Sequence, residues 1–219
     1  MTLKDLLRAR TSKLSVLDVL TGVVLLIAFY LFVRPGSPAY VSVRQKLAER
    51  QQEKAIVANW QELARVAMPL YIGGGEPDII EFSDYECPFC KEVSPTIDSA
   101  IASDVRVAVV HFPLAKHARA VPAAHAALCA ARSGKFVEAH HELFSRSDWR
   151  SDSASIKLRS NSGSKCPSDQ SLDWLLALHL AFAKRLSVKA TPAFFSRQTL
   201  FKGAPTLANL KLLAQPASN

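Results

Sequence analysis

The sequence predicts an α/β domain that follows an N-terminal membrane-spanning helix and a helical spacer. The first observation is an apolar segment of 20 residues, Leu14 to Val33, with a single charge, Asp18, near its start. The second is an apolar run, Ile79 to Phe82, that leads into Cys87-Pro-Phe-Cys90. A helix is expected after this pair, and a second β-branched run, Val105 to Phe112, follows it. A strand–helix–strand order favours parallel pairing of the two strands.

Composition sets the broad class of the chain. Its 219 residues suit one domain with appendages, and 49% hydrophobic with 21% charged residues is ordinary for a globular protein. Lys and Arg number 27 against 19 Asp and Glu, which gives a net charge of +8. These basic residues are scattered along the chain, so we expect no nucleic-acid partner.

The apolar segment at residues 14–33 is expected to cross a membrane. At about 1.5 Å per residue it spans about 30 Å, the thickness of a bilayer core. The 13 residues before it carry four basic side chains and one acidic one, which favours a cytoplasmic N-terminus. A cleaved signal peptide is the alternative, but Ser37-Pro-Ala39 matches its cleavage site poorly. We predict an uncleaved, single-pass anchor of an inner membrane, with residues 1–13 cytoplasmic and the remainder periplasmic.

Residues 34–70 are predicted to form a linker and a spacer helix. Pro35 to Pro38 is typical of a linker at a membrane exit, and Val41 to Met68 has a helical composition. An apolar stripe along this helix is interrupted by polar residues from Arg50 to Lys54. A coiled coil needs several unbroken heptads, so we favour a spacer over oligomerisation through residues 41–68.

Residues 71–219 are expected to form the main domain, with a helical insertion at about 115–186. Amphipathic or Ala-rich patterns predict its helices, a polar stretch predicts a loop, and a strand beginning at Thr191 is expected to form a hairpin. The predicted segments are helices at Val121–Arg132, Lys135–Phe144 and Ser171–Leu186, a loop at Ser151–Ser168, a second hairpin strand at Leu200–Lys202 and a last helix capped by Thr206.

Four cysteines are present, and their spacing separates them into two pairs. Cys87 and Cys90 stand at a helix start, where unpaired N–H groups and the helix dipole favour a thiolate. This pair indicates redox chemistry. Outside the cytoplasm disulfides persist, so Cys129 and Cys166 are candidates for a structural bridge, with two free thiols as the alternative.

Two other classes of function were weighed. A zinc module could combine Cys87 and Cys90 with a further cysteine or histidines, but structural zinc sites usually use a second close pair, which the sequence lacks. A membrane-tethered chaperone without redox activity is the other alternative. We expect neither a metal nor another cofactor.

Four motifs resemble the DsbA-like group of exported thiol–disulfide oxidoreductases. They are Glu81-Phe-Ser-Asp-Tyr-Glu-Cys-Pro-Phe-Cys90, His111-Phe-Pro-Leu114, Gly134-Lys-Phe136 with its following histidines, and Thr191-Pro-Ala-Phe-Phe195 followed by Gly203-Ala-Pro205. Their order and spacing cover about residues 75–215. The resemblance implies a thioredoxin fold with a helical insertion.

The resemblance also implies a role for each matching residue. Cys87 would be the exposed nucleophile and Cys90 its resolving partner. Pro192 would be a cis-proline facing the pair, and Thr191 would present backbone groups to a substrate peptide. Glu81 would be the buried acid beneath the pair, able to relay the proton of Cys90.

Phe89 departs from the pattern of the strongly oxidising members, which have Pro-His inside the pair. Phenylalanine cannot stabilise the Cys87 thiolate as histidine does, which would make the disulfide less oxidising. Phe89 is also a candidate substrate contact. The resemblance implies disulfide exchange with exported cysteine-containing proteins, recycled by a membrane redox partner. We favour dithiol oxidation, with reduction or isomerisation as the alternative.

Overall fold

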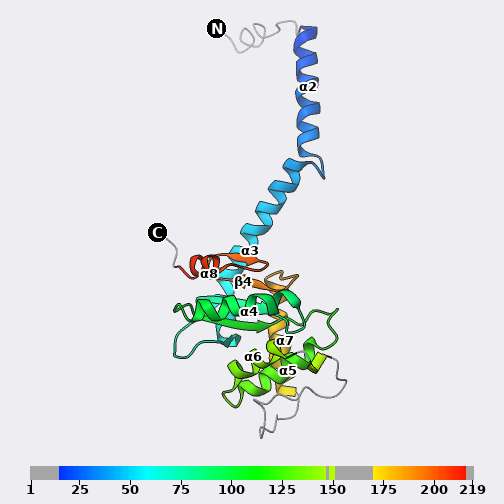
Figure 1. Ribbon diagram of the computed structural model, residues 1–219. Helices are drawn as coiled ribbons and strands as arrows, with labels where there is room; N and C mark the ends of the chain where they lie inside the picture. Colours follow the sequence, from blue (N-terminus) through cyan, green and yellow to red (C-terminus); the bar gives the residue numbers. More distant parts are fainter. Residues whose placement is uncertain (1–14, 147, 151–169, 216–219) are drawn as a thin grey trace. The chain divides into compact units, whose positions relative to one another are not determined.

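A computed structural model describes residues 15–146, 148–150 and 170–215. The chain forms two compact units, Met1–Gln51 and Gln52–Asn219 (Figure 1). In the first unit, helix α2 spans Val16–Val33, and none of its residues is buried. Ser15 and Asp18 form a capping box at its start. Its 18 residues have a mean hydropathy of 2.6, long and apolar enough for a membrane span by length and composition.

The second unit is built on a five-stranded sheet in the order β1-β3-β2-β4-β5. The parallel pairing of β2 with β3 and the hairpin of β4 with β5 confirm the topology predicted from the sequence. The bounds are Met68–Pro69 for β1, Ile79–Ser83 for β2, Val107–His111 for β3, Ala193–Phe195 for β4 and Leu200–Lys202 for β5.

Strand β1 corrects the predicted end of the spacer helix. Helix α3 spans Pro38–Val66, and Met68, which we expected in that helix, pairs with Val109 of β3. Pro69 provides the physical reason, because a proline disfavours helical backbone in the residue before it.

Helices cover both faces of the sheet. On one face, Ile79 and Val107 pack with α4 (Pro88–Ile101) and α8 (Leu207–Leu213), which lie side by side in Figure 1. Thr206 caps α8, as predicted. On the other face, Ile80 and Phe82 pack with residues of α3 and α7 (Gln170–Arg185).

The end of α3 is part of the second unit. Ile56, Trp60 and Leu63 are buried against the sheet, and Arg185 of α7 donates to Glu62 over 3.0 Å. The unit therefore begins at Gln52 rather than at residue 71, because the apolar stripe of α3 covers the sheet.

Helices α5 (Ala120–Ala131), α6 (Phe136–Ser145) and α7 form the predicted insertion (Figure 1). The helix predicted from Ser171 begins at Gln170, so Ser171 lies inside α7, where its hydroxyl accepts a hydrogen bond from Arg132 over 2.6 Å. The loop predicted at Ser151–Ser168 lies outside the described residues.

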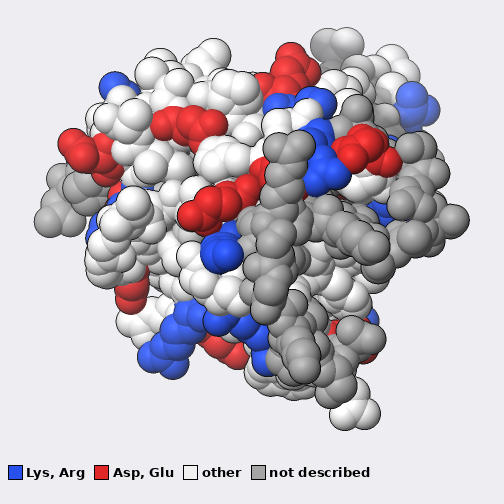
Figure 2. All heavy atoms as spheres, turned by 60° about the horizontal axis from the view of Figure 1, so that its bottom comes forward, with Lys and Arg blue, Asp and Glu red and all other residues white. Residues whose placement is uncertain are grey.

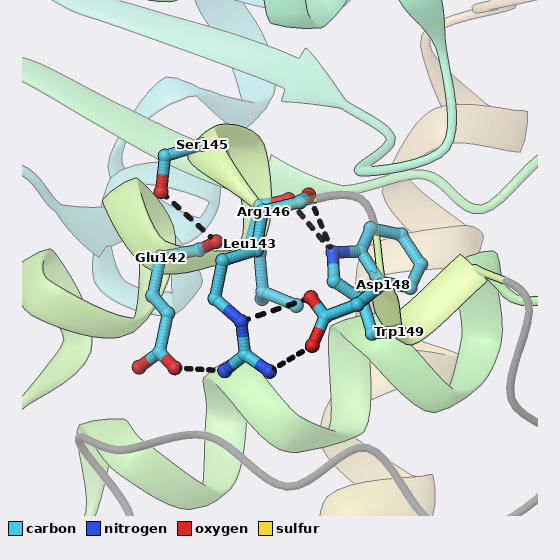
Figure 3. Close-up of polar contacts among 6 residues, drawn as sticks. All are labelled: Glu142, Leu143, Ser145, Arg146, Asp148 and Trp149. Carbon is cyan, nitrogen blue, oxygen red and sulfur yellow. Dashed lines mark hydrogen bonds and ion pairs between the residues drawn. The ribbon is translucent and has the colours of Figure 1, made fainter.

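A short turn closes the end of α6 (Figure 3). The indole of Trp149 donates to the carbonyls of Leu143 and Arg146 over 3.0 and 3.1 Å. The guanidinium of Arg146 bridges the carboxylates of Glu142 and Asp148. These contacts satisfy carbonyls that a helix end leaves without partners.

The face drawn in Figure 2 carries blue and red side chains interspersed among uncoloured ones. The positive charge of the chain is therefore not gathered into one basic field over the described part of this face.

Candidate redox site

The Cys87–Cys90 pair stands at the N-terminus of α4, next to the carboxyl end of β2. Cys87 is the N-cap residue with extended backbone, Pro88 is the first helical residue and Cys90 lies in the first turn. Proline suits that position because its missing N–H would have no helical partner. Both thiols are free. The helix thus presents its unpaired N–H groups to the Cys87 sulfur.

The two thiols have opposite acidities. A hydrogen bond from the Cys90 thiol, with others from the backbone N–H groups of Phe89 and Cys90, lowers the pKa of Cys87 to about 5 despite its burial. Burial, together with that same hydrogen bond, raises the pKa of Cys90 well above its usual value. Cys87 therefore favours the thiolate and Cys90 keeps its proton, which are the acidities that a nucleophile and its resolving partner would need.

Cys87 is less accessible than expected. Its residue is only 3% exposed, whereas Cys90 is fully buried. The Thr191 carbonyl lies 3.4 Å from the Cys87 sulfur and accepts a hydrogen bond from it when the thiol is protonated. Phe89, by contrast, is 59% exposed beside the pair. A partner would therefore meet the Phe89 ring and a small part of Cys87.

Thr191 and Pro192 face the pair from the start of β4. The peptide bond between them is cis, as the resemblance implied. The hydroxyl of Thr191 is buried beside the Cys87 sulfur and helps to lower the pKa of that thiol. The backbone next to β4 therefore lies against the reactive sulfur.

Glu81 is buried in the central strand β2. It pairs in register with Val109 and Phe194 and is 0% exposed. Burial, with the nearby Cys87 adding to it, raises the pKa of Glu81 to about 8. The carboxyl is therefore protonated at neutral pH and can give or take a proton in the physiological range.

Two further polar side chains share this face of the sheet. Ser83 lies two residues after Glu81, and it pairs in register with His111 of β3. A hydrogen bond from Ser83 lowers the pKa of Glu81 against the effect of burial. Both ring nitrogens of His111 are buried without a partner among the described residues. Ordered water commonly satisfies such groups. No sequence signal singles out Ser83 and His111 as site residues, although Ser83 lies within the cysteine motif and His111 begins the His111-Phe-Pro-Leu114 motif.

The second cysteine pair is only partly described. Cys129 is disulfide-bonded and packs in α5, while Cys166 lies outside the described residues. The pairing of Cys129 with Cys166 therefore stays a prediction. Among the residues that the structure describes, no group of three His, Cys, Asp or Glu side chains could hold a metal ion.

Comparisons with known proteins agree with this geometry. Residues 74–214 match the family described as thioredoxin. A linker-deletion mutant of ScsC from Proteus mirabilis is 18% identical, with a TM-score of 0.66 over 93% of this chain and 96% of that one. The thiol–disulfide exchange protein α-DsbA2 from Wolbachia pipientis is also 18% identical, with a TM-score of 0.63 over 75% and 95%.

A different relative matches only a short stretch. The Na(+)/H(+) antiporter NhaA 1 of Mycolicibacterium gilvum is 43% identical over 82 residues, which is 34% of this chain and 13% of the antiporter. The chain thus covers about an eighth of the length of that relative. A match to so small a share of the antiporter carries no transport function over to this chain.

The fold and the cysteine pair define a thioredoxin-fold protein with a Cys-x-x-Cys pair at a helix start. The chain belongs to the thioredoxin family. The predicted fold class, an α/β thioredoxin fold with a helical insertion after an apolar N-terminal helix, is confirmed.

Proposed function

We propose that this protein is a membrane-anchored dithiol oxidase that acts on exported cysteine-containing proteins outside the cytoplasm. The observation that carries the direction is the lowered pKa of Cys87. A stabilised thiolate favours the reduced pair, which makes the disulfide a better oxidant. The contrary feature is Phe89, which adds no positive charge. Reduction or isomerisation is therefore the second candidate.

The proposed reaction begins with the Cys87–Cys90 disulfide. A substrate thiolate attacks the Cys87 sulfur, and the bond to Cys90 breaks. Cys90 leaves as a thiolate and takes a proton, which the protonated Glu81 can supply. A second substrate thiolate then attacks the substrate sulfur of the mixed disulfide and expels the Cys87 thiolate. The substrate loses two electrons and the pair gains them.

Each residue of the site has a part in this proposal. The backbone at Thr191 and the cis-proline Pro192 would hold an extended substrate segment, and Phe89 would contact its side chains. Re-oxidation needs an external acceptor, which we propose to be a membrane-bound disulfide carrier. Helix α2, with the positively charged residues before it, would anchor the chain in an inner membrane with the catalytic unit in the periplasm.

The direction of exchange is tested by the reduction potential of the pair, measured against glutathione with the full chain in detergent. A value near about −120 mV supports an oxidase, and one near about −270 mV supports a reductase. Cys87→Ser should abolish exchange. Cys90→Ser keeps the Cys87 thiolate but cannot resolve the product, so it should trap a mixed disulfide when it is mixed with a disulfide-containing model peptide. Retained exchange in Cys87→Ser would overturn the mechanism, and absence of exchange in the wild type would favour the chaperone alternative.

Location needs a separate experiment. A reporter that is active only outside the cytoplasm, fused after residue 219, should be active. An inactive reporter would contradict the proposed orientation of the anchor.

A further inference from the structure

A second acidic residue of the cysteine motif is buried three positions before Cys87. The side chain of Asp84 is 0% exposed. A buried carboxylate is costly unless several donors satisfy it. Asp84 has three donors, and two of them come from a loop about thirty residues further along the chain.

The contacts of Asp84 join two loops. Its Oδ1 accepts from the N–H of Glu86 over 2.7 Å, which forms a local turn. Its Oδ2 accepts from the N–H of Leu114 and from Nδ1 of His117, each over 2.8 Å. The imidazole must carry a proton on Nδ1 for this contact, because a carboxylate only accepts.

The same turn positions the nucleophile. The N–H of Cys87 donates to the backbone carbonyl of Asp84 over 3.1 Å. The next carboxylate, Glu86, accepts from the N–H of Arg119 over 2.7 Å. The two carboxylates of the turn, Asp84 and Glu86, thus bind the two ends of the segment from Leu114 to Arg119. His117 is the side-chain donor of this connection.

We propose that His117 is a positioning residue for the exchange reaction: by donating to Asp84 it fixes the turn that places the Cys87 sulfur at the N-terminus of α4. This role rests on the proposed exchange function. His117 does not touch the sulfur in any contact described for it. It acts through Asp84 and the Cys87 N–H, so that the N–H groups of Phe89 and Cys90 meet the thiolate.

Hydrogen bonds to a thiolate weaken when a donor moves away from its ideal distance. Loss of the His117 donor should therefore reduce stabilisation of the Cys87 thiolate. The expected shift in its titration midpoint is upward by about half to one pH unit, a three- to tenfold loss of thiolate at low pH. The disulfide should become less oxidising in the same proportion.

The test compares two isosteric substitutions in the full chain. His117→Asn keeps a donor near the position of Nδ1. His117→Leu introduces a side chain of the same shape as that asparagine but without a donor. The thiolate midpoint is read from ultraviolet absorbance, which needs no substrate or partner. Asn should retain the wild-type midpoint and Leu should raise it. The matched control is the same pair of substitutions at His141, whose contact with Asp98 is longer, 3.8 Å, and exposed.

The possible results are distinct. Equal thiolate midpoints for His117→Leu, His117→Asn and the wild type would overturn the proposal. Equal upward shifts in the two variants would also overturn it, because lost packing rather than lost hydrogen-bond donation would explain them. If His117→Leu does not fold, His117→Ala replaces it, and the same comparison with Asn applies. Failure of the wild type to exchange disulfides would refute the proposed function, whereas the midpoint comparison would still decide the role of His117.

Discussion

The hydroxyl of Tyr85 lies 3.1 Å from Nδ1 of His140, and both residues are buried. Burial raises the pKa of Tyr85 well above its usual value, so the phenol keeps its proton and donates a hydrogen bond to the neutral imidazole. Tyr85 stands two residues before Cys87, whereas His140 lies in α6. This hydrogen bond therefore joins the cysteine motif to the helical insertion.

Tyr85→Phe should destabilise the protein by about 1–3 kcal/mol, because it leaves a buried imidazole nitrogen without its donor. Urea unfolding measures this loss. The matched control is Tyr71→Phe, whose hydroxyl donates to the Gly75 carbonyl over 2.8 Å at the surface. An exposed hydrogen bond is replaced by water, so the control should change stability little. Equal losses in both variants would contradict a special role for the Tyr85–His140 contact.

The sequence predicted those elements whose signals are local. The helix at Cys87, the parallel strands and the cap at Thr206 follow from periodicity, β-branched runs and capping residues. Strand β1 escaped because two residues, Met68 and Pro69, carry no alternating pattern. The packing of α3 on the sheet was missed because its apolar stripe looks the same for a spacer and for a covering helix.

The site was predictable where a motif carried it and obscure where the fold brings distant residues together. Cys87, Cys90, Glu81 and Pro192 lie in motifs with recognisable spacing. Asp84 and His117 are separated by 33 positions, and only the tertiary structure places them 2.8 Å apart. The low exposure of Cys87 also depends on Thr191, which lies 104 positions away.

Glu81→Gln should slow exchange, since an amide cannot deliver the proton that Cys90 takes up. We expect a loss of up to about a hundredfold, the lower range for general acid–base catalysis. Stopped-flow reduction by a model dithiol measures this rate. Glu92→Gln, on the exposed face of α4, is the control. An unchanged rate in Glu81→Gln would exclude the proton relay.

The same substitution should change the pH dependence of stability. Folding raises the pKa of Glu81 from 4.5 to about 8, so the folded chain binds more protons between these values. Its contribution to stability is complete below about pH 4.5 and is lost as pH rises to about 8, by about 1.4 kcal/mol per pH unit. Glu81→Gln should remove this slope and be relatively more stable at alkaline pH. Urea unfolding of both proteins at several pH values decides the matter.

Acid should destabilise the oxidised protein. Burial lowers the pKa of His140 to about 3 and that of His179 to about 4, from an ordinary 6.5. It lowers the pKa of His111 as well. The unfolded chain therefore binds more protons as pH falls below about 6.5, and stability is lost in that direction. Three histidines outweigh Glu81, which acts in the opposite direction.

The urea midpoint of the oxidised protein, in which neither redox cysteine titrates, should fall between about pH 6.5 and pH 4. Substituting the half-exposed His141 by Asn should keep this fall, because burial is the main cause of the low pKa of His140 and His141 only adds to it. A flat curve would mean that the buried histidines can take up protons without disturbing the fold.

Phe89→His should make the pair more oxidising. An imidazolium beside Cys87 would stabilise the thiolate and hence the reduced form, whereas the phenyl ring cannot. Phe89 is 59% exposed, so the change should cost little stability. We expect the potential to rise by about 30 mV or more, since 30 mV corresponds to about 1.4 kcal/mol for two electrons.

The control is Phe89→Leu, which removes the ring without adding charge. Because the effect needs a charged imidazole, it should fade at pH values well above about 6.5, where the two variants should converge. If the potentials of the His and Leu variants agree at every pH, charge at this position does not tune the pair, and the acidity of Cys87 depends on Cys90, Thr191 and the helix N-terminus.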